Sequence, residues 1–210
     1  MQKKAHPTSQ RLLATATALQ DAHPGENITV EMVLTASGIS KGSLYHHYHD
    51  FDDLLDRCHV ARFARQVDES IALIDEVLGG AETPDDFYNG LAAITRATQA
   101  RPNSQFRTMR VAALAKAGER ESMRIQLARE QQRLTNTLAD IARDAQERGF
   151  IVSTLDPYAV AVMVQAYTLG RVIDDITDKH VDEQAWYSMV DQLVAAVFMG
   201  DPTLARRADE

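Results

Sequence analysis

Apolar residues recur at intervals of three and four positions along almost the whole chain, and apolar and polar residues alternate in few places. This is the periodicity of helices that bury one face. Six prolines and ten glycines in 210 residues interrupt the pattern only rarely. The sequence therefore predicts an all-α protein of about nine helices, long enough for one or two compact domains.

Capping residues predict where the first helices begin. Thr29, Ser40 and Asp50 each precede a short apolar repeat, and each side chain can accept a hydrogen bond from the first helical turn. An earlier helix is expected to begin at Thr8 or Ser9. Four short helices in the first sixty residues predict a small three-helix head followed by a connecting helix.

Longer apolar repeats after the head predict a larger helical bundle. We therefore expect two domains, a head over residues 1–50 and a body over residues 51–210. The chain carries a net charge of −8, which ordinarily counts against binding to nucleic acid. Residues 1–49, however, contain four basic and three acidic residues, so the acidity belongs to the body.

The remaining composition fits a cytoplasmic protein. The single cysteine excludes an internal disulfide, and no run of apolar residues is long enough to cross a membrane. We expect no membrane association and no cofactor.

The segment from Thr29 to Tyr48 has the spacing of a helix-turn-helix, with Gly38 in the turn. Leu44 and Tyr48 lie four residues apart, so both can pack on the earlier helices. The other positions of the second helix carry serine, lysine, tyrosine and histidine side chains, which can donate hydrogen bonds. One face of this helix is thus expected to pack and the other to contact a partner.

The string Gly-Ile-Ser-Lys-Gly-Ser-Leu-Tyr-His-His-Tyr at residues 38–48, followed by an acidic helix start and Leu54-Leu55, resembles the DNA-binding head of the TetR (tetracycline-repressor-like) family. The resemblance covers residues 8–56, and the rest of the chain is similar only in architecture. It implies a homodimeric transcription regulator, a repressor, on a near-palindromic double-stranded DNA operator. A small-molecule effector of unknown identity in the C-terminal domain would release the DNA.

The resemblance implies eight DNA-facing residues: Thr29, Ser40, Lys41, Gly42, Ser43, Tyr45, His46 and His47. Phosphate contacts are expected from Thr29, the segment 40–42 and His47. Base or groove-edge contacts are expected from Ser43, Tyr45 and His46, with a phosphate contact as the alternative for Tyr45. Relatives commonly have a lysine where this chain has Phe51. That difference predicts weaker nonspecific binding and a shallower dependence of affinity on salt.

Two sets of body residues follow from the family architecture. The expected effector pocket comprises Phe63, Tyr88, Phe106, Met109, Arg110, Met163 and Tyr167, although each also fits a core position. Arg107 and Arg110 can pair with an anionic ligand or form ion pairs on a solvated face.

The run from Tyr158 to Gly170 contains no charged residue, which indicates a helix covered on several sides. A partner subunit would supply that cover through a four-helix bundle. The alternative is a central core helix in a monomer. The expected dimer interface comprises Val160, Val164, Trp186, Val190, Leu193 and Val197.

Other functions find less support in the sequence. The histidines at 46, 47, 49 and 59 and Cys58 could suggest a metal site, but neighbouring helical histidines diverge by about 100°. Cys58 alone is a weak candidate for a redox sensor. Beyond residue 60 the chain has one histidine, His180, and no nucleophile paired with a base, so we expect no enzyme and no catalytic or metal-binding residues. A helical small-molecule-binding or adaptor protein without DNA affinity remains the alternative.

Overall fold

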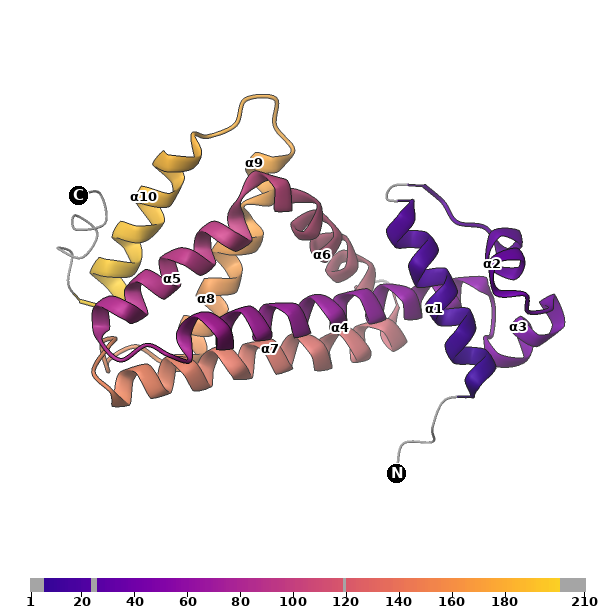
Figure 1. Ribbon diagram of the computed structural model, residues 1–210, viewed down its shortest axis with the longest axis horizontal. Coiled ribbons are helices and arrows are strands. Elements are labelled where there is room, and N and C mark those ends of the chain that lie inside the picture. The colour runs from indigo at the N-terminus through magenta and orange to yellow at the C-terminus, as the bar shows by residue number, and fades with distance from the viewer. Residues whose placement is uncertain (1–5, 24–25, 119, 201–210) are drawn as a thin grey trace.

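The computed structural model describes residues 6–23, 26–118 and 120–200. Over these ranges all regular structure is helical, which confirms the all-α prediction. Nine of the α-helices have seven or more residues, and the segment α9 has four. The molecule is elongated, with a small head at one end and a larger body at the other (Figure 1).

The first three helices form the head. They are α1 (Pro7–Ala22), α2 (Val30–Ser37) and α3 (Lys41–His47). The body contains α4 (Phe51–Leu78), α5 (Pro84–Gln99), η1 (Arg101–Asn103), α6 (Ser104–Ala117), α7 (Glu121–Glu147), α8 (Pro157–Gly170), α9 (Val172–Asp175), α10 (Glu183–Leu193) and η2 (Val194–Phe198).

The predicted caps of the second, third and fourth helices are confirmed. Thr29 and Ser40 each accept a hydrogen bond at 3.3 Å from the amide three residues on, and Asp50 does so at 2.7 Å. The predicted start of the first helix is wrong. It begins at Pro7, because a proline fits the first helical position and His6 Nδ1 accepts the Thr8 amide at 3.3 Å.

Two apolar cores lie along the molecule, and α4 contributes to both. The head core consists of Leu12, Ala16, Ile28, Val33, Leu44, Tyr48, Leu54 and Cys58. Further along α4, Phe63 is the first of its residues in the body core. The start of α4 therefore packs with the head although its length runs through the body, beside α7 (Figure 1).

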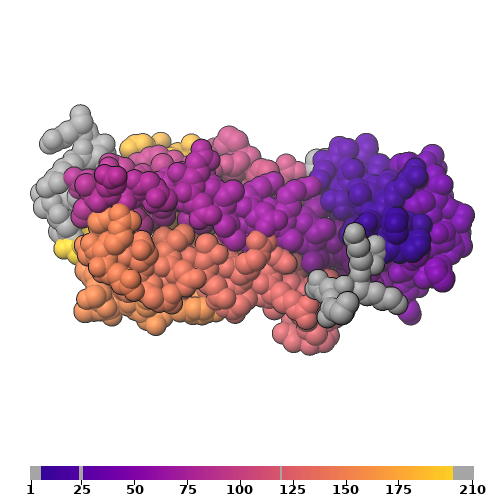
Figure 2. All heavy atoms as spheres, turned by 60° about the horizontal axis from the view of Figure 1, so that its bottom comes forward, coloured from indigo at the N-terminus to yellow at the C-terminus, as the bar shows by residue number. Residues whose placement is uncertain are grey.

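Ion pairs join α4 to neighbours at the head end. Arg62 and Arg65 of α4 both reach the carboxylate of Asp21 on α1, at 2.9 and 2.8 Å. Figure 2 shows the head as a lobe at one end of the molecule, with α4 and α7 extending from it into the body. The helix α4 thus contributes residues to both the head core and the body core.

Candidate nucleic-acid interface and effector cavity

The inner face of α3 is fixed to α1. Leu44 is completely buried and Tyr48 is 2% exposed. The Tyr48 hydroxyl donates to the carbonyl oxygen of Ser9 at 2.8 Å and accepts from the Ser9 hydroxyl at 3.0 Å. Burial raises the pKa of Tyr48. These contacts determine which side of α3 faces outward.

The turn between α2 and α3 depends on Gly38, whose φ of 66° lies in the left-handed region. The Ser37 side chain is buried here, and its hydroxyl oxygen accepts the Ile39 amide at 3.3 Å. The turn thus sets the angle between the two helices.

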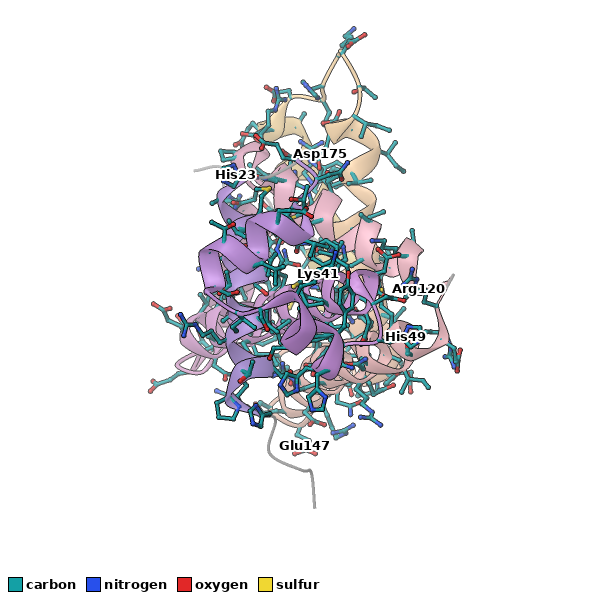
Figure 3. All side chains as sticks on the ribbon, turned by 90° about the vertical axis from the view of Figure 1, so that its right-hand side faces the viewer. His23, Lys41, His49, Arg120, Glu147 and Asp175 are labelled. Atoms are coloured by element: carbon teal, nitrogen blue, oxygen red, sulfur yellow. The ribbon has the colours of Figure 1, made fainter. Side chains whose placement is uncertain are left out.

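The eight residues predicted to face DNA lie together on α3 or on the residues that cap α2 and α3. Six of them are exposed: Thr29, Ser40, Lys41, Gly42, Tyr45 and His46. Ser43 and His47 are half-buried. In Figure 3, which looks onto the head end of the molecule, Lys41 lies near the centre of this surface.

Gly42 has no packing role in the chain. A Cβ added there would meet no atom within 4 Å, and its φ is not positive. An alanine would therefore fit the fold at this position. The backbone of α3 is therefore open to approach from outside at Gly42.

His47 belongs to a small group of imidazoles. Its ring stacks on His6 with centroids 4.8 Å apart, and the His46 ring lies edge-on at 5.1 Å. Burial, followed by the charges of His6 and His46, lowers the pKa of His47. His6 was not among the residues predicted from the sequence, and its position directly before Pro7 was the signal that α1 begins there.

Phe51 packs against the head core and is half-buried. The neighbouring acids have local partners: Asp52 pairs with Arg120 at 3.3 Å, and Asp53 pairs with Arg57 at 3.0 Å. Replacement of Phe51 by lysine would therefore remove apolar packing as well as add a charge, a cost that was not visible in the sequence.

A cavity of about 340 Å³ lies in the body between α4, α5, α6, α7, α8 and η2. Of the predicted pocket residues, Phe106, Arg110 and Tyr167 line it. Most of the remaining lining is apolar. The volume lies within the range of small-molecule sites, near its lower end.

The other four predicted pocket residues lie outside this lining. Phe63 and Tyr88 are buried in the body core, at 2% and 3% exposure. Met109 contacts the guanidinium of Arg62 through its sulfur, and Met163 is 43% exposed. Their prediction rested on residue type, which does not separate cavity walls from core or surface.

Arg107 and Arg110 both line the cavity but differ in their partners. Arg107 donates to both oxygens of Asp175, at 2.8 and 2.7 Å. Arg110 donates through Nη2 to Gln131 Oε1 at 2.9 Å, and its guanidinium lies 4.9 Å from the ring of Phe63. Asp175 and Gln131 were not predicted as partners, because neither is near the arginines in sequence.

The predicted dimer residues divide between the two sides of their helices. Val160 and Val164 line the cavity, and Val190 is 3% exposed in the body core. Trp186 also turns inward, with its Nε1 donating to Gln99. Leu193 and Val197 are 37% and 46% exposed. Val190 is thus buried within its own chain, Val160, Val164 and Trp186 are half-buried with contacts inside the body, and the interface over the six residues stays a prediction.

Other apolar side chains on α8 and α10 are exposed. They are Tyr158, Val162 and Met163 on α8 and Met189 on α10, each between 43% and 53% exposed. With Ala159 and Ala166, those on α8 form a stripe without charge. Because α8 is uncharged all round, its sequence does not indicate which face points outward, and the residues predicted for the interface lie on its inward face.

Among the described residues, no three histidine, cysteine, aspartate or glutamate side chains are grouped as a metal site would require. Cys58 is completely buried, and burial raises the pKa of its thiol to about 11, so the thiolate needed for redox chemistry is disfavoured. In the part of the chain that the structure describes, no helix combines the length and apolarity needed to cross a bilayer.

Solved structures are similar to this chain over nearly its whole length. A protein assigned to the TetR family of transcriptional regulators, from Mesorhizobium loti MAFF303099, has a TM-score of 0.65 at 14% identity, covering 94% of this chain and 100% of that one. Another, from Rhodococcus sp., has a TM-score of 0.59 at 24% identity, covering 90% and 99%. The superantigen PfiT has a TM-score of 0.61 at 14% identity, covering 95% and 100%.

The chain has the TetR-family fold. No protein-family model matches the sequence, and no curated protein is significantly similar to it. The TetR-like fold is also that of PfiT, so fold alone does not decide function. The chemistry of the head and of the cavity therefore carries the functional assignment.

Proposed function

We propose that this protein is a DNA-binding transcriptional regulator, a repressor whose homodimer leaves its operator when a small molecule occupies the body cavity. The observation that carries the proposal is the outer face of α3. Its exposed donors lie on a helix whose inner face is held by Tyr48 and Leu44. The likeness to TetR-family regulators supports the same function.

In this scheme the head, residues 1–50, binds DNA and the body, residues 51–210, binds the effector and the second subunit. Residues 1–5 and 201–210 of these ranges lie outside the described part of the chain. The division is functional, since the head core also includes Leu54 and Cys58 of α4.

The amides at the start of α3 and the Lys41 side chain would contact phosphates. A helix start attracts anions through its free amides and its dipole, which adds to the small formal charge of the head. Tyr45, His46 and Ser43 would contact base edges. Gly42 supports this arrangement because its open position lets a phosphate approach the backbone.

Homodimerisation would cover the exposed apolar stripes of α8 and α10. In a dimer the two heads would dock in successive major grooves, about 34–36 Å apart. Such a dimer requires a near-palindromic operator, and changing the distance between heads would release it.

A route for that change runs from the cavity to the head. The cavity is lined by α6, and Arg120 directly precedes α7, the next helix along the chain. Arg120 donates to Asp56 of α4 at 2.7 Å and to Asp52 at 3.3 Å. A ligand that binds one arrangement of α6 more tightly would thereby bias α4 and the head attached to it.

Selection from random-sequence DNA tests the proposal and needs no assumption about the operator sequence. The full chain is mixed with the pool, bound DNA is recovered through several rounds, and the product is sequenced. We expect a near-palindromic motif with half-sites about 10 base pairs apart, centre to centre. Recovery of no motif would favour the alternative, a helical ligand-binding or adaptor protein.

A further inference from the structure

The charge balance around the cavity is incomplete. Two arginines, Arg107 and Arg110, contribute to its wall from α6. The buried carboxylate of Asp175 neutralises Arg107 through two hydrogen bonds. Among the described residues no carboxylate makes an ion pair with Arg110, which lies one turn further along the same helix.

Arg110 is half-buried, and its guanidinium packs against the ring of Phe63. Its Nε is buried and has no hydrogen-bond partner in the described part of the molecule, and only Nη2 donates, to Gln131. Burial alone lowers the pKa of Arg110 to about 10, so the side chain remains protonated at neutral pH. A buried cation is costly unless a charge or several hydrogen bonds compensate it.

One acidic side chain, Glu69, also lines the cavity. It is exposed to solvent and makes no ion pair with Arg110 among the described contacts. Arg110 therefore has a buried Nε–H without a hydrogen-bond partner and, among the described residues, no paired negative charge. A ligand can supply that charge.

The hydrogen bonds around Arg110 hold it in place. Gln131, which accepts from Arg110, donates to Gln165 of α8, and Gln165 donates to Thr135 at 3.1 Å. This chain of hydrogen bonds crosses from α6 through α7 to α8. Gln165 also lines the cavity, so this chain of hydrogen bonds joins Arg110 to a second polar residue of the wall.

Most of the remaining cavity wall suits an apolar group of a ligand. Ile74, Leu91 and Leu138 from three different helices line it, together with Val164 and Phe198. A ligand that is mostly apolar would match these walls. One anionic group would match Arg110, and a planar carboxylate fits the donors of a guanidinium in particular.

We propose that the cavity binds a small monoanion, a carboxylate with an alkyl or aryl group, and that Arg110 is its counter-ion. This inference rests on the proposed function, because it specifies the chemical class of the effector. A dianion such as a phosphate monoester fits less well, because the second arginine of the wall, Arg107, already forms an ion pair with Asp175.

Calorimetric titration of the full chain without DNA tests the proposal directly. The probes are straight-chain carboxylates of about six to twelve carbons and 4-butylbenzoate, each compared with the alcohol of the same carbon skeleton. We expect at least one carboxylate to bind about tenfold or more tightly than its matched alcohol. Comparison of the alkyl with the aryl probes shows which kind of apolar group the cavity prefers.

The matched variants are Arg110→Met and Arg129→Met. Arg129 is an exposed arginine of α7, so its replacement controls for loss of one positive charge. Arg110→Met should weaken carboxylate binding about 10- to 100-fold and leave alcohol binding unchanged. Arg129→Met should bind carboxylates as the unaltered chain does, and circular dichroism checks that both variants are folded.

Three outcomes would overturn the inference: equal affinity for carboxylates and alcohols, unchanged carboxylate binding by Arg110→Met, or binding of neither series. The comparison of acid with alcohol needs no variant, so it holds even if Arg110→Met misfolds. A carboxylate that binds through Arg110 but leaves DNA affinity unaltered would contradict the proposed release from the operator and not the ligand class.

Discussion

The guanidinium of Arg107 and the carboxylate of Asp175 form a buried ion pair with two hydrogen bonds, and the two side chains are 4% and 5% exposed. The pair joins α6 to α9. Arg107 also donates to the carbonyl oxygens of Thr98 and Ala100, at 2.9 and 3.2 Å. In the described part of the chain, Asp175 is the one carboxylate paired with Arg107, which lines the cavity.

Asp175→Ala should lower the free energy of unfolding by about 3–5 kcal/mol, because it leaves a buried charge without its partner. Urea unfolding measures the loss. Asp140→Ala, which breaks an exposed pair with Arg143, should cost at most about 1 kcal/mol. Equal losses for the two variants would show that the Arg107–Asp175 pair contributes no more than a surface pair.

Gly38 and Gly42 should respond oppositely to alanine. Gly38→Ala should cost about 1–2 kcal/mol of stability, since its φ of 66° is unfavourable for a residue with a Cβ. Gly42→Ala should leave stability unchanged or raise it by up to about 1 kcal/mol, because the added methyl meets no atom.

The DNA affinity of Gly42→Ala should nevertheless fall, since the methyl group would lie between the α3 backbone and a phosphate. Urea unfolding and binding to the selected operator separate the two effects. Unchanged DNA affinity of a folded Gly42→Ala chain would show that the α3 backbone at this position does not contact DNA.

His47 should make DNA binding depend on pH. The pKa of His47 is lowered in the free protein, so the imidazole is neutral at pH 7. A nearby phosphate raises that pKa, and protons are taken up on binding. Affinity should therefore rise as the pH falls through the interval between the raised pKa of the DNA-bound imidazole and the lowered pKa of the free one.

His47→Gln should flatten that profile, as measured by fluorescence anisotropy with operator DNA. His23→Gln is the matched control, because His23 and His6 lie at opposite ends of α1. Figure 3 also shows His23 apart from Lys41 of α3. A profile of His47→Gln that is as steep as that of the unaltered chain would assign the pH dependence to other groups.

The exposed apolar residues of α8 and α10 should hold a dimer together. Met189 is 53% exposed, and Met189→Glu would place a charge in the proposed interface. Sedimentation should find a dimer for the unaltered chain and a monomer for this variant at micromolar concentration. Ile125→Glu, at a 42% exposed position on α7, should remain dimeric. A monomeric unaltered chain would contradict the interface.

Local signals in the sequence were sufficient to predict where α2, α3 and α4 begin. The caps Thr29, Ser40 and Asp50 act within one helical turn, so the residues that form them are close in sequence. The start of α1 was missed because His6 is a less usual cap than the serine or threonine that follow it. Packing of Leu44 and Tyr48 followed from their spacing of four residues.

The body could not be predicted as closely, because its site depends on contacts between distant residues. Asp175 is 68 residues from Arg107, and Gln131 is 21 residues from Arg110. Nothing near the arginines in sequence indicates which of them is neutralised. In α8, the absence of charge on every face left the direction of Val160 and Val164 undetermined until the neighbouring helices were in place.

The assignment of α3 as the recognition helix can be tested by measuring binding of the unaltered chain and of Lys41→Ala/Tyr45→Ala to the selected operator across a range of salt concentrations. Both residues are exposed on α3, so the variant should remain folded. We expect it to lose about 100-fold or more in affinity, and the slope of log affinity against log salt to become shallower by about two for a dimer that loses two phosphate contacts. A folded variant with unchanged affinity and slope would show that α3 is not the recognition helix.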